Sequence, residues 1–176
     1  MRRWLGPALL LTACAAAAHA ATLHFAPDAI MGRAMDALAA RGVVLHRFTA
    51  PERVTPQTQS VVRSSPDLFY ALCRYDLADS GAWLTLQMAQ WPDYQSLSFF
   101  DARTNNFATI RGSGKLVAVR LLSPRSAAEP GAIVSPTASG VILIRRLAPD
   151  AERFAAAAMA SSGDHCQLER DGAASS

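Results

Sequence analysis

The sequence has few of the features by which a reaction is usually recognised, and the same scarcity limits the partners it can have. It contains 17 Lys and Arg against 14 Asp and Glu, and after residue 20 it has no basic run beyond Arg145-Arg146. Because phosphate binding depends on clustered Lys and Arg, we do not expect nucleic acid as a partner. Arg145-Arg146 closes an apolar run, so we expect both side chains to lie at a solvated strand end.

Motifs for catalysis and for metal binding are equally scarce. No Gly-x-Ser-x-Gly elbow occurs, and Ser113 between two glycines indicates a turn. His24, His46 and His165 have no partner at metal-ligand spacing. The sequence therefore predicts neither a metal site nor a cofactor.

The first twenty residues are organised like an export signal. Arg2 and Arg3 precede an apolar run from Trp4 to Leu11, and Ala18-His19-Ala20 offers the small residues that a signal peptidase accepts. Cleavage after the last of these would lower the formal net charge from +3 to +1. We expect residues 1–20 to be a signal peptide and the remaining chain to be one periplasmic or cell-envelope domain.

Two other processing routes remain open. Leu11-Thr12-Ala13-Cys14 has the residue order of a lipoprotein signal, which would leave a lipidated Cys14 as the new N-terminus. The stretch from Trp4 to Ala21 could instead stay as a membrane anchor, although a stable span needs roughly 20 predominantly apolar residues. By either route the membrane would be contacted through the N-terminus alone.

Cys73 and Cys166 are the pair left by secretion or by lipidation of Cys14. In an oxidising compartment we expect them to form a disulfide, with two separate thiols as the alternative. Closing a loop of about 93 residues would contribute about 4 to 5 kcal/mol in the chain-entropy model. Residues 161–176 form a polar tail that has little reason to be ordered unless this bond holds it.

Hydrophobic periodicity predicts a mainly β protein with one helix before the strands and one after them. Residues 29–41 carry apolar side chains at helical spacing between Pro27-Asp28 and Gly42, and Pro149-Asp150 precedes a second helix over about 151–160. From Leu68 the period changes to two. The pattern favours an antiparallel sandwich or barrel.

The predicted strands are short and separated by turn residues. They cover residues 43–48, 68–77, 83–88, 94–101, 107–110, 115–122, 132–134 and 141–144. Because Asp79-Ser80-Gly81 is a tight-turn sequence, we expect 68–77 and 83–88 to pair as an antiparallel hairpin.

Two segments of this region resemble a known family. Ser65-Pro66-Asp67-Leu68-Phe69-Tyr70 and the strand that follows it are similar to the Asn-Pro-Asp-Thr-Leu-Tyr segment of the bacterial "domain of unknown function 1254" family. The segment from Tyr94 to Ala108 resembles more closely the Tyr-x-Ser-Leu, Asp, Thr-Asn and Phe-Ala pattern of that family. With Gly140–Leu147 as a closing strand, the resemblance covers roughly residues 62–158. It implies a jelly-roll-like antiparallel β-sandwich, in a domain over residues 21–160.

The chain also departs from the family pattern. Ser65, Leu68 and Ala71 stand where family members often have Asn, Thr and Ser, so polar groups that could line a pocket are weakened or lost. Longer members carry a companion β domain, for which we expect no room in 176 residues. The resemblance therefore implies a short exported or membrane-associated variety with no established activity.

A polar cluster lies where one of the predicted strands ends. Asp101, Arg103, Asn105 and Asn106 follow one another closely there. Asx side chains at such a corner can bind backbone amides and let the chain reverse before Phe107. The same four groups could instead surround a small ligand at one end of the sandwich, which makes them the candidate binding residues.

Three functions from different classes remain open. We favour a non-enzymatic envelope domain that binds another envelope protein, with residues 29–41 as a docking helix. The second is a periplasmic small-ligand-binding module. The third is a hydrolase, by analogy with longer family members, which would require Asp67, Asp76 and Asp101 to approach one another as an acid and a base.

Overall fold

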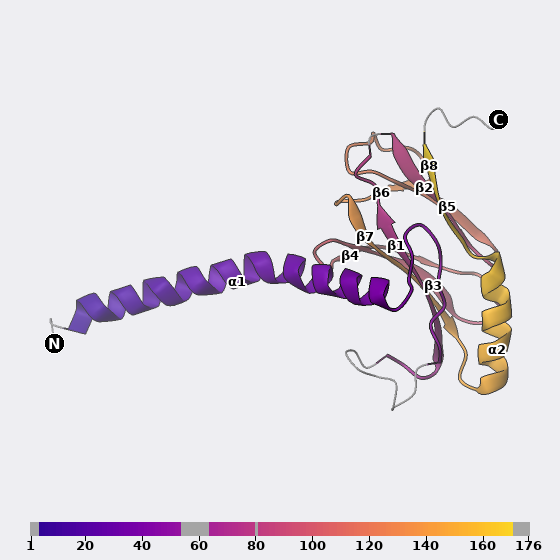
Figure 1. The fold of residues 1–176 in the computed structure, drawn as a ribbon, viewed down its shortest axis with the longest axis horizontal. Coiled ribbons are helices and arrows are strands. Elements are labelled where there is room, and N and C mark those ends of the chain that lie inside the picture. Colours follow the sequence, from indigo (N-terminus) through magenta and orange to yellow (C-terminus); the bar gives the residue numbers. More distant parts are fainter. Residues whose placement is uncertain (1–3, 54–63, 80, 171–176) are drawn as a thin grey trace.

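Two sheets of four strands each make up the body of the protein, with one helix before the strands and one near their end (Figure 1). The computed structural model describes residues 4–53, 64–79 and 81–170. Its helices are α1 (Leu5–Ala40), α2 (Ala151–Ala160) and the short 3-10 helix η2 (Ser161–Gly163). Its strands are β1 (Leu68–Asp76), β2 (Ala82–Met88), β3 (Gln95–Asp101), β4 (Asn106–Arg111), β5 (Val117–Leu122), β6 (Ala132–Val134), β7 (Ser139–Leu147) and β8 (His165–Arg170).

The strand order is β1-β7-β3-β4 in one sheet and β6-β5-β2-β8 in the other. All neighbouring strands are antiparallel except β5 and β6, which are parallel. The predicted mainly β fold with a helix at each end is therefore confirmed, while the jelly-roll connectivity remains a prediction.

A disulfide between Cys73 of β1 and Cys166 of β8 joins the two sheets, with a Cα–Cα distance of 6.6 Å. This confirms the predicted pairing. Because β1 and β8 each end a sheet, the bond closes one side of the sandwich and leaves β4 and β6 on the other side.

The core lies between the sheets and follows the period of two predicted for β1. Phe69, Ala71, Cys73 and Tyr75 are buried, whereas the residues that alternate with them are only half-buried or exposed. Leu84, Leu86 and Met88 of β2, Leu97 and Phe99 of β3 and Ile142 and Ile144 of β7 pack against them.

The predicted hairpin of residues 68–77 and 83–88 is wrong. β1 pairs with β7, and β2 lies in the other sheet between β5 and β8. The turn after β1 carries the chain from one layer to the other. A turn sequence fixes where a strand ends, but the choice of neighbour depends on packing between segments far apart in the chain.

Two predictions about the N-terminal region also need correction. The helix begins at Leu5, not near residue 29, and it continues through Pro27, because the Ala-rich stretch before it consists of strong helix formers. Its end agrees with the prediction, since Gly42 has a φ of 81° just after the last turn. The strand expected over 43–48 is reduced to isolated bridges, Leu45 with Arg74 and Thr49 with Leu72.

The polar tail expected from residue 161 is folded as far as the structure describes it. β8 pairs with β2 from Ala82 to Gln87, so the domain extends beyond Ala160 to Arg170. The disulfide at Cys166 holds this strand in place, in agreement with the prediction that the tail is ordered only if this bond holds it.

Candidate functional site

The polar cluster predicted from the sequence forms the corner between β3 and β4. Asp101 is buried, and its Oδ1 accepts hydrogen bonds from the backbone amides of Arg103 (2.8 Å) and Asn105 (2.9 Å). Its Oδ2 accepts a third bond from Nδ2 of Asn105 at 2.9 Å. Thr104, between them, has a φ of 66°, which shows how sharply the chain turns. The carboxylate thus closes the loop from inside.

The other two residues of the cluster point away from this carboxylate. Arg103 reaches α1, where Nη2 donates to the carbonyl oxygen of His24 at 3.0 Å and Nη1 lies 3.4 Å from Oδ2 of Asp28. Asn106 accepts a hydrogen bond from Oγ1 of Thr109 at 3.1 Å. The four predicted residues are therefore neighbours, but their polar groups bind the protein itself. This geometry supports the capping interpretation of the corner, and ligand binding there stays a prediction.

A buried tyrosine lies next to this corner. The hydroxyl of Tyr75 lies 2.9 Å from Oγ of Ser135 and donates to the carbonyl oxygen of Phe100 at 3.3 Å. Burial, and to a smaller extent the negative charge of Asp101, raises the pKa of Tyr75 to about 12, while hydrogen bonds from Ser135 and Thr137 oppose the rise. A phenol held protonated in this way acts as a structural hydrogen-bond donor.

The expectation that Arg146 is solvated is wrong. Its guanidinium donates to Asp164 at 2.8 and 2.6 Å, and both side chains are completely buried. Asp164 also accepts from the amide of Ala89 at 2.8 Å. The period of two in β7 carried the missing signal, since Ile142, Ile144 and residue 146 fall on the same inward face. Nothing in the sequence near residue 164 indicates the partner.

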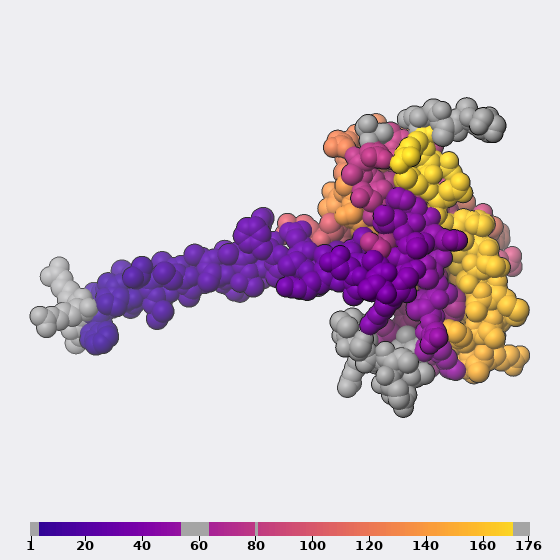
Figure 2. All heavy atoms as spheres, viewed as in Figure 1, coloured from indigo at the N-terminus to yellow at the C-terminus, as the bar shows by residue number. Residues whose placement is uncertain are grey.

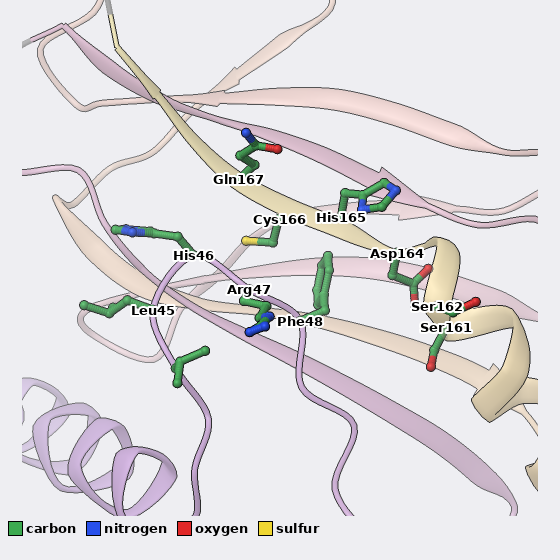
Figure 3. A pocket seen from close by; sticks show the side chains of 11 residues that line it. Leu45, His46, Arg47, Phe48, Ser161, Ser162, Asp164, His165, Cys166 and Gln167 are labelled. Atoms are coloured by element: carbon green, nitrogen blue, oxygen red, sulfur yellow. The ribbon is translucent and has the colours of Figure 1, made fainter. Parts of the chain in front are cut away.

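A groove lies on the disulfide side of the sandwich, between the segment from Val44 to Phe48 and the stretch from η2 to Gln167 (Figure 3). Its volume is about 620 Å³. Arg47 contributes a positive charge to it, and among the described lining residues the one carboxylate, that of Asp164, is already bound by Arg146. The groove is therefore electropositive, a property that the sequence pattern did not reveal.

The opposite side of the sandwich is incompletely covered. Ile110 lies opposite Leu97, Val119 opposite Leu86 and Ile133 opposite Leu121, so each points inward like its buried partner. These side chains nevertheless remain half-buried because β4 and β6 are the last described strands of their sheets. We call the set the open edge. It consists of Phe107, Ala108, Ile110, Val117, Val119 and Ile133.

Comparison with known families identifies the group to which this fold belongs. The model of a family described as "Protein of unknown function (DUF1254)" matches residues 45–167, which include every strand up to the first part of β8. The chain belongs to this family. The resemblance seen in the two motif segments is thereby confirmed over a longer stretch than 62–158. No curated protein matches the sequence.

Two solved structures share the fold of this DUF1254 protein. The VPA0106 protein from Vibrio parahaemolyticus has a TM-score of 0.57 and 12% identity, over 84% of this chain and 35% of its own. A protein from Burkholderia cenocepacia has a TM-score of 0.52 and 12% identity, over 77% of this chain and 38% of its own. At this identity the likeness shows the fold alone. The present chain thus corresponds to little more than a third of either solved protein.

Proposed function

We propose that this DUF1254 protein is a non-enzymatic module of the cell envelope that binds a second, separately encoded protein through the open edge. The disulfide between the sheets supports a location outside the cytosol, since such bonds persist in oxidising compartments. The hydrolase alternative receives no support from Asp101, whose two carboxylate oxygens bind the loop around them.

The half-buried state of the open edge is the observation that carries the proposal. Inward-facing apolar side chains of a sandwich are normally covered by further strands, and apolar area left in contact with water costs about 25 cal/mol per Å². Among the described strands, none lies beyond β4 or β6 to cover these side chains. β4 also presents a backbone edge to which an extended segment of another chain could pair.

The length of the solved relatives indicates what kind of partner fits. In both of them the matching fold accounts for 35–38% of the chain, so it is joined there to a large additional portion. We infer that the open edge receives a β-rich partner protein with an apolar strand edge. Such an interface would bury the open edge and add a neighbour to β4.

Site-specific photo-crosslinking in the producing cell tests this proposal. A photoreactive phenylalanine at Ile133 should yield one defined adduct with another envelope protein, and the same residue at Met159 of α2 should not. Met159 is the control because it is 72% exposed and belongs to α2, at the far side of the body in Figure 1. The variant Ile110→Asp should abolish the adduct formed from Ile133.

The outcome can also contradict the proposal. An adduct only with a second copy of the same chain would show that the open edge binds another copy of this protein and not a different partner. Equal labelling from Ile133 and Met159 would show that the edge has no specific occupant. Thermal unfolding of Ile110→Asp must accompany the experiment, because loss of the adduct counts only if the variant is folded.

The electropositive groove supports a second candidate function, binding of a small carboxylate ligand. Arg47 is exposed there, and the part of the groove lining that the structure describes offers no competing free carboxylate. Titration with succinate should raise the melting temperature of the wild type, and Arg47→Gln should remove the effect while Arg111→Gln on β4 retains it. A flat titration of the wild type would eliminate this candidate.

A further inference from the structure

The first half of α1 is apolar and separate from the rest of the protein. No Asp, Glu, Lys or Arg occurs from Trp4 to Pro27, and an 18-residue window has a mean hydropathy of 1.5 with none of it buried. Figure 2 shows this half as a rod that stands clear of the sandwich. From Leu5 to Phe25 the helix is about 32 Å long, which matches a hydrocarbon core of about 30 Å.

The ends of this apolar stretch have the residues of a membrane-spanning helix. Arg2 and Arg3 precede it, as expected for the cytoplasmic end, and Trp4 lies where aromatic side chains meet the lipid headgroups. Asp28 follows it on the side of the disulfide-bonded body. Both features place the sandwich outside the cytoplasm.

The sequence expected to be cleaved lies within the helix. Ala18-His19-Ala20 is in the middle of α1, and the helix continues without a break to Ala40. A peptidase binds its substrate in an extended form, so this segment would have to unfold before it could be cut. The same helix that carries the apolar stretch also contacts β7 of the body.

One side chain fixes the helix to the body at the end of the apolar stretch. Arg103 donates to the carbonyl oxygen of His24 at 3.0 Å and lies 3.4 Å from Asp28, which flanks Pro27. Because Pro27 has no amide hydrogen, the helix is loosened here and Leu23 loses its usual partner. The loop closure by Asp101 holds the Arg103 backbone at this position.

We propose that α1 is retained as a transmembrane anchor, and that Arg103 braces the sandwich against the outer surface of the membrane. His24 lies at the end of the apolar stretch and Asp28 comes just after it, so both lie at the level of the lipid headgroups. The β3–β4 corner is then the part of the body closest to the membrane, and α2 faces away from it. This inference does not depend on the partner proposed for the open edge.

The anchor is tested on the protein isolated from cell membranes. Intact mass should show a chain that still contains residues 4–27, and the protein should resist alkaline carbonate extraction. Cys14→Ser should leave both results unchanged, because the free, exposed Cys14 thiol has no part in this anchor. A mature chain that begins at Ala21, a lipidated Cys14, or release by carbonate would each overturn the proposal.

The brace is tested by energy transfer in vesicles of phosphatidylethanolamine and phosphatidylglycerol that carry a headgroup dye. The full chain with Cys14→Ser is labelled either at Thr104→Cys, in the corner, or at Met159→Cys, on α2. Transfer should be several-fold higher from the corner than from α2. Arg103→Gln should reduce the signal from Thr104→Cys, whereas Arg111→Gln, a change of the same kind on β4, should not.

Two outcomes would show that the brace is wrong even if the anchor is correct. Equal transfer from both labels would mean that the body is not oriented on the membrane. An unchanged signal from Thr104→Cys in Arg103→Gln would mean that this side chain does not hold the body in place. The melting temperature of each variant separates a change of position from unfolding, and Arg103→Lys should restore part of the signal.

Discussion

Replacement of Asp164 by Asn should be among the most damaging single changes in the protein. The Asp164 carboxylate accepts two hydrogen bonds from Arg146 and one from the amide of Ala89. Both charged side chains are fully buried, so the variant leaves the guanidinium without its counter-charge inside the sandwich. Breaking one partner of a buried pair costs about 3 to 5 kcal/mol.

This cost translates into a large change in melting temperature. For a folded body of about 130 residues, 1 kcal/mol shifts the melting temperature by about 3 °C. Asp164→Asn should therefore melt about 10 to 15 °C below the wild type. The measurement is thermal unfolding of the full chain in mild detergent, followed by circular dichroism and by tryptophan fluorescence, whose agreement tests for a two-state transition.

Two further variants distinguish the buried pair from ordinary ion pairing. Arg153→Met breaks the exposed contact between Arg153 and Asp93, where the side chains are 45% and 36% exposed, and should cost less than about 1 kcal/mol. Arg146→Met combined with Asp164→Leu removes both buried charges and should be more stable than Asp164→Asn. If Asp164→Asn were no worse than Arg153→Met, the buried pair would not be holding β7 to the C-terminal stretch.

Three other predictions concern the disulfide, the buried phenol and the corner. The pair Cys73→Ala and Cys166→Ala should lower stability by about 4 to 5 kcal/mol, seen as a lower guanidinium midpoint, and an unchanged midpoint would contradict the role of the bond. Since the pKa of Tyr75 is raised to about 12 in the folded protein, its contribution is fully present below pH 10 and is lost as the pH rises through 12. Unfolding free energies of the wild type should fall more steeply over that range than those of Tyr75→Phe, and parallel curves would refute this. Asn105→Ala should cost about 1 kcal/mol or more by losing its bond to the corner carboxylate, and should cost more than Asn106→Ala in the same urea titration.

The features that could be predicted from the sequence are those decided by neighbouring residues. The alternation in β1 is visible because successive side chains point to opposite faces, and α2 begins just after Asp150, whose side chain accepts from the amide of Arg153 as an N-cap does. The pairing of Cys73 with Cys166 could be predicted from the count of cysteines and the expectation of export.

The features that cannot be predicted from the sequence depend on segments far apart in the chain. The partner of β1 is β7, more than sixty positions later, and no turn sequence encodes that choice. The burial of Arg146 requires Asp164, which looks like an ordinary polar residue until the chain folds back. The start of α1 is hidden for another reason, because Pro27-Asp28 resembles a helix start although the preceding alanines extend the helix through it.

The polar cluster at the corner illustrates how a recognisable motif can serve assembly. Asp101 and Asn105, which belong to the family-like pattern, form hydrogen bonds that close the loop. Arg103 lies inside that loop but outside the pattern, and closure directs its side chain outward to α1. Loop closure and attachment of the helix are therefore carried by different side chains. It follows that Arg103 can be changed to remove its link between the body and α1 while the corner itself stays folded, whereas loss of Asp101 would disturb both.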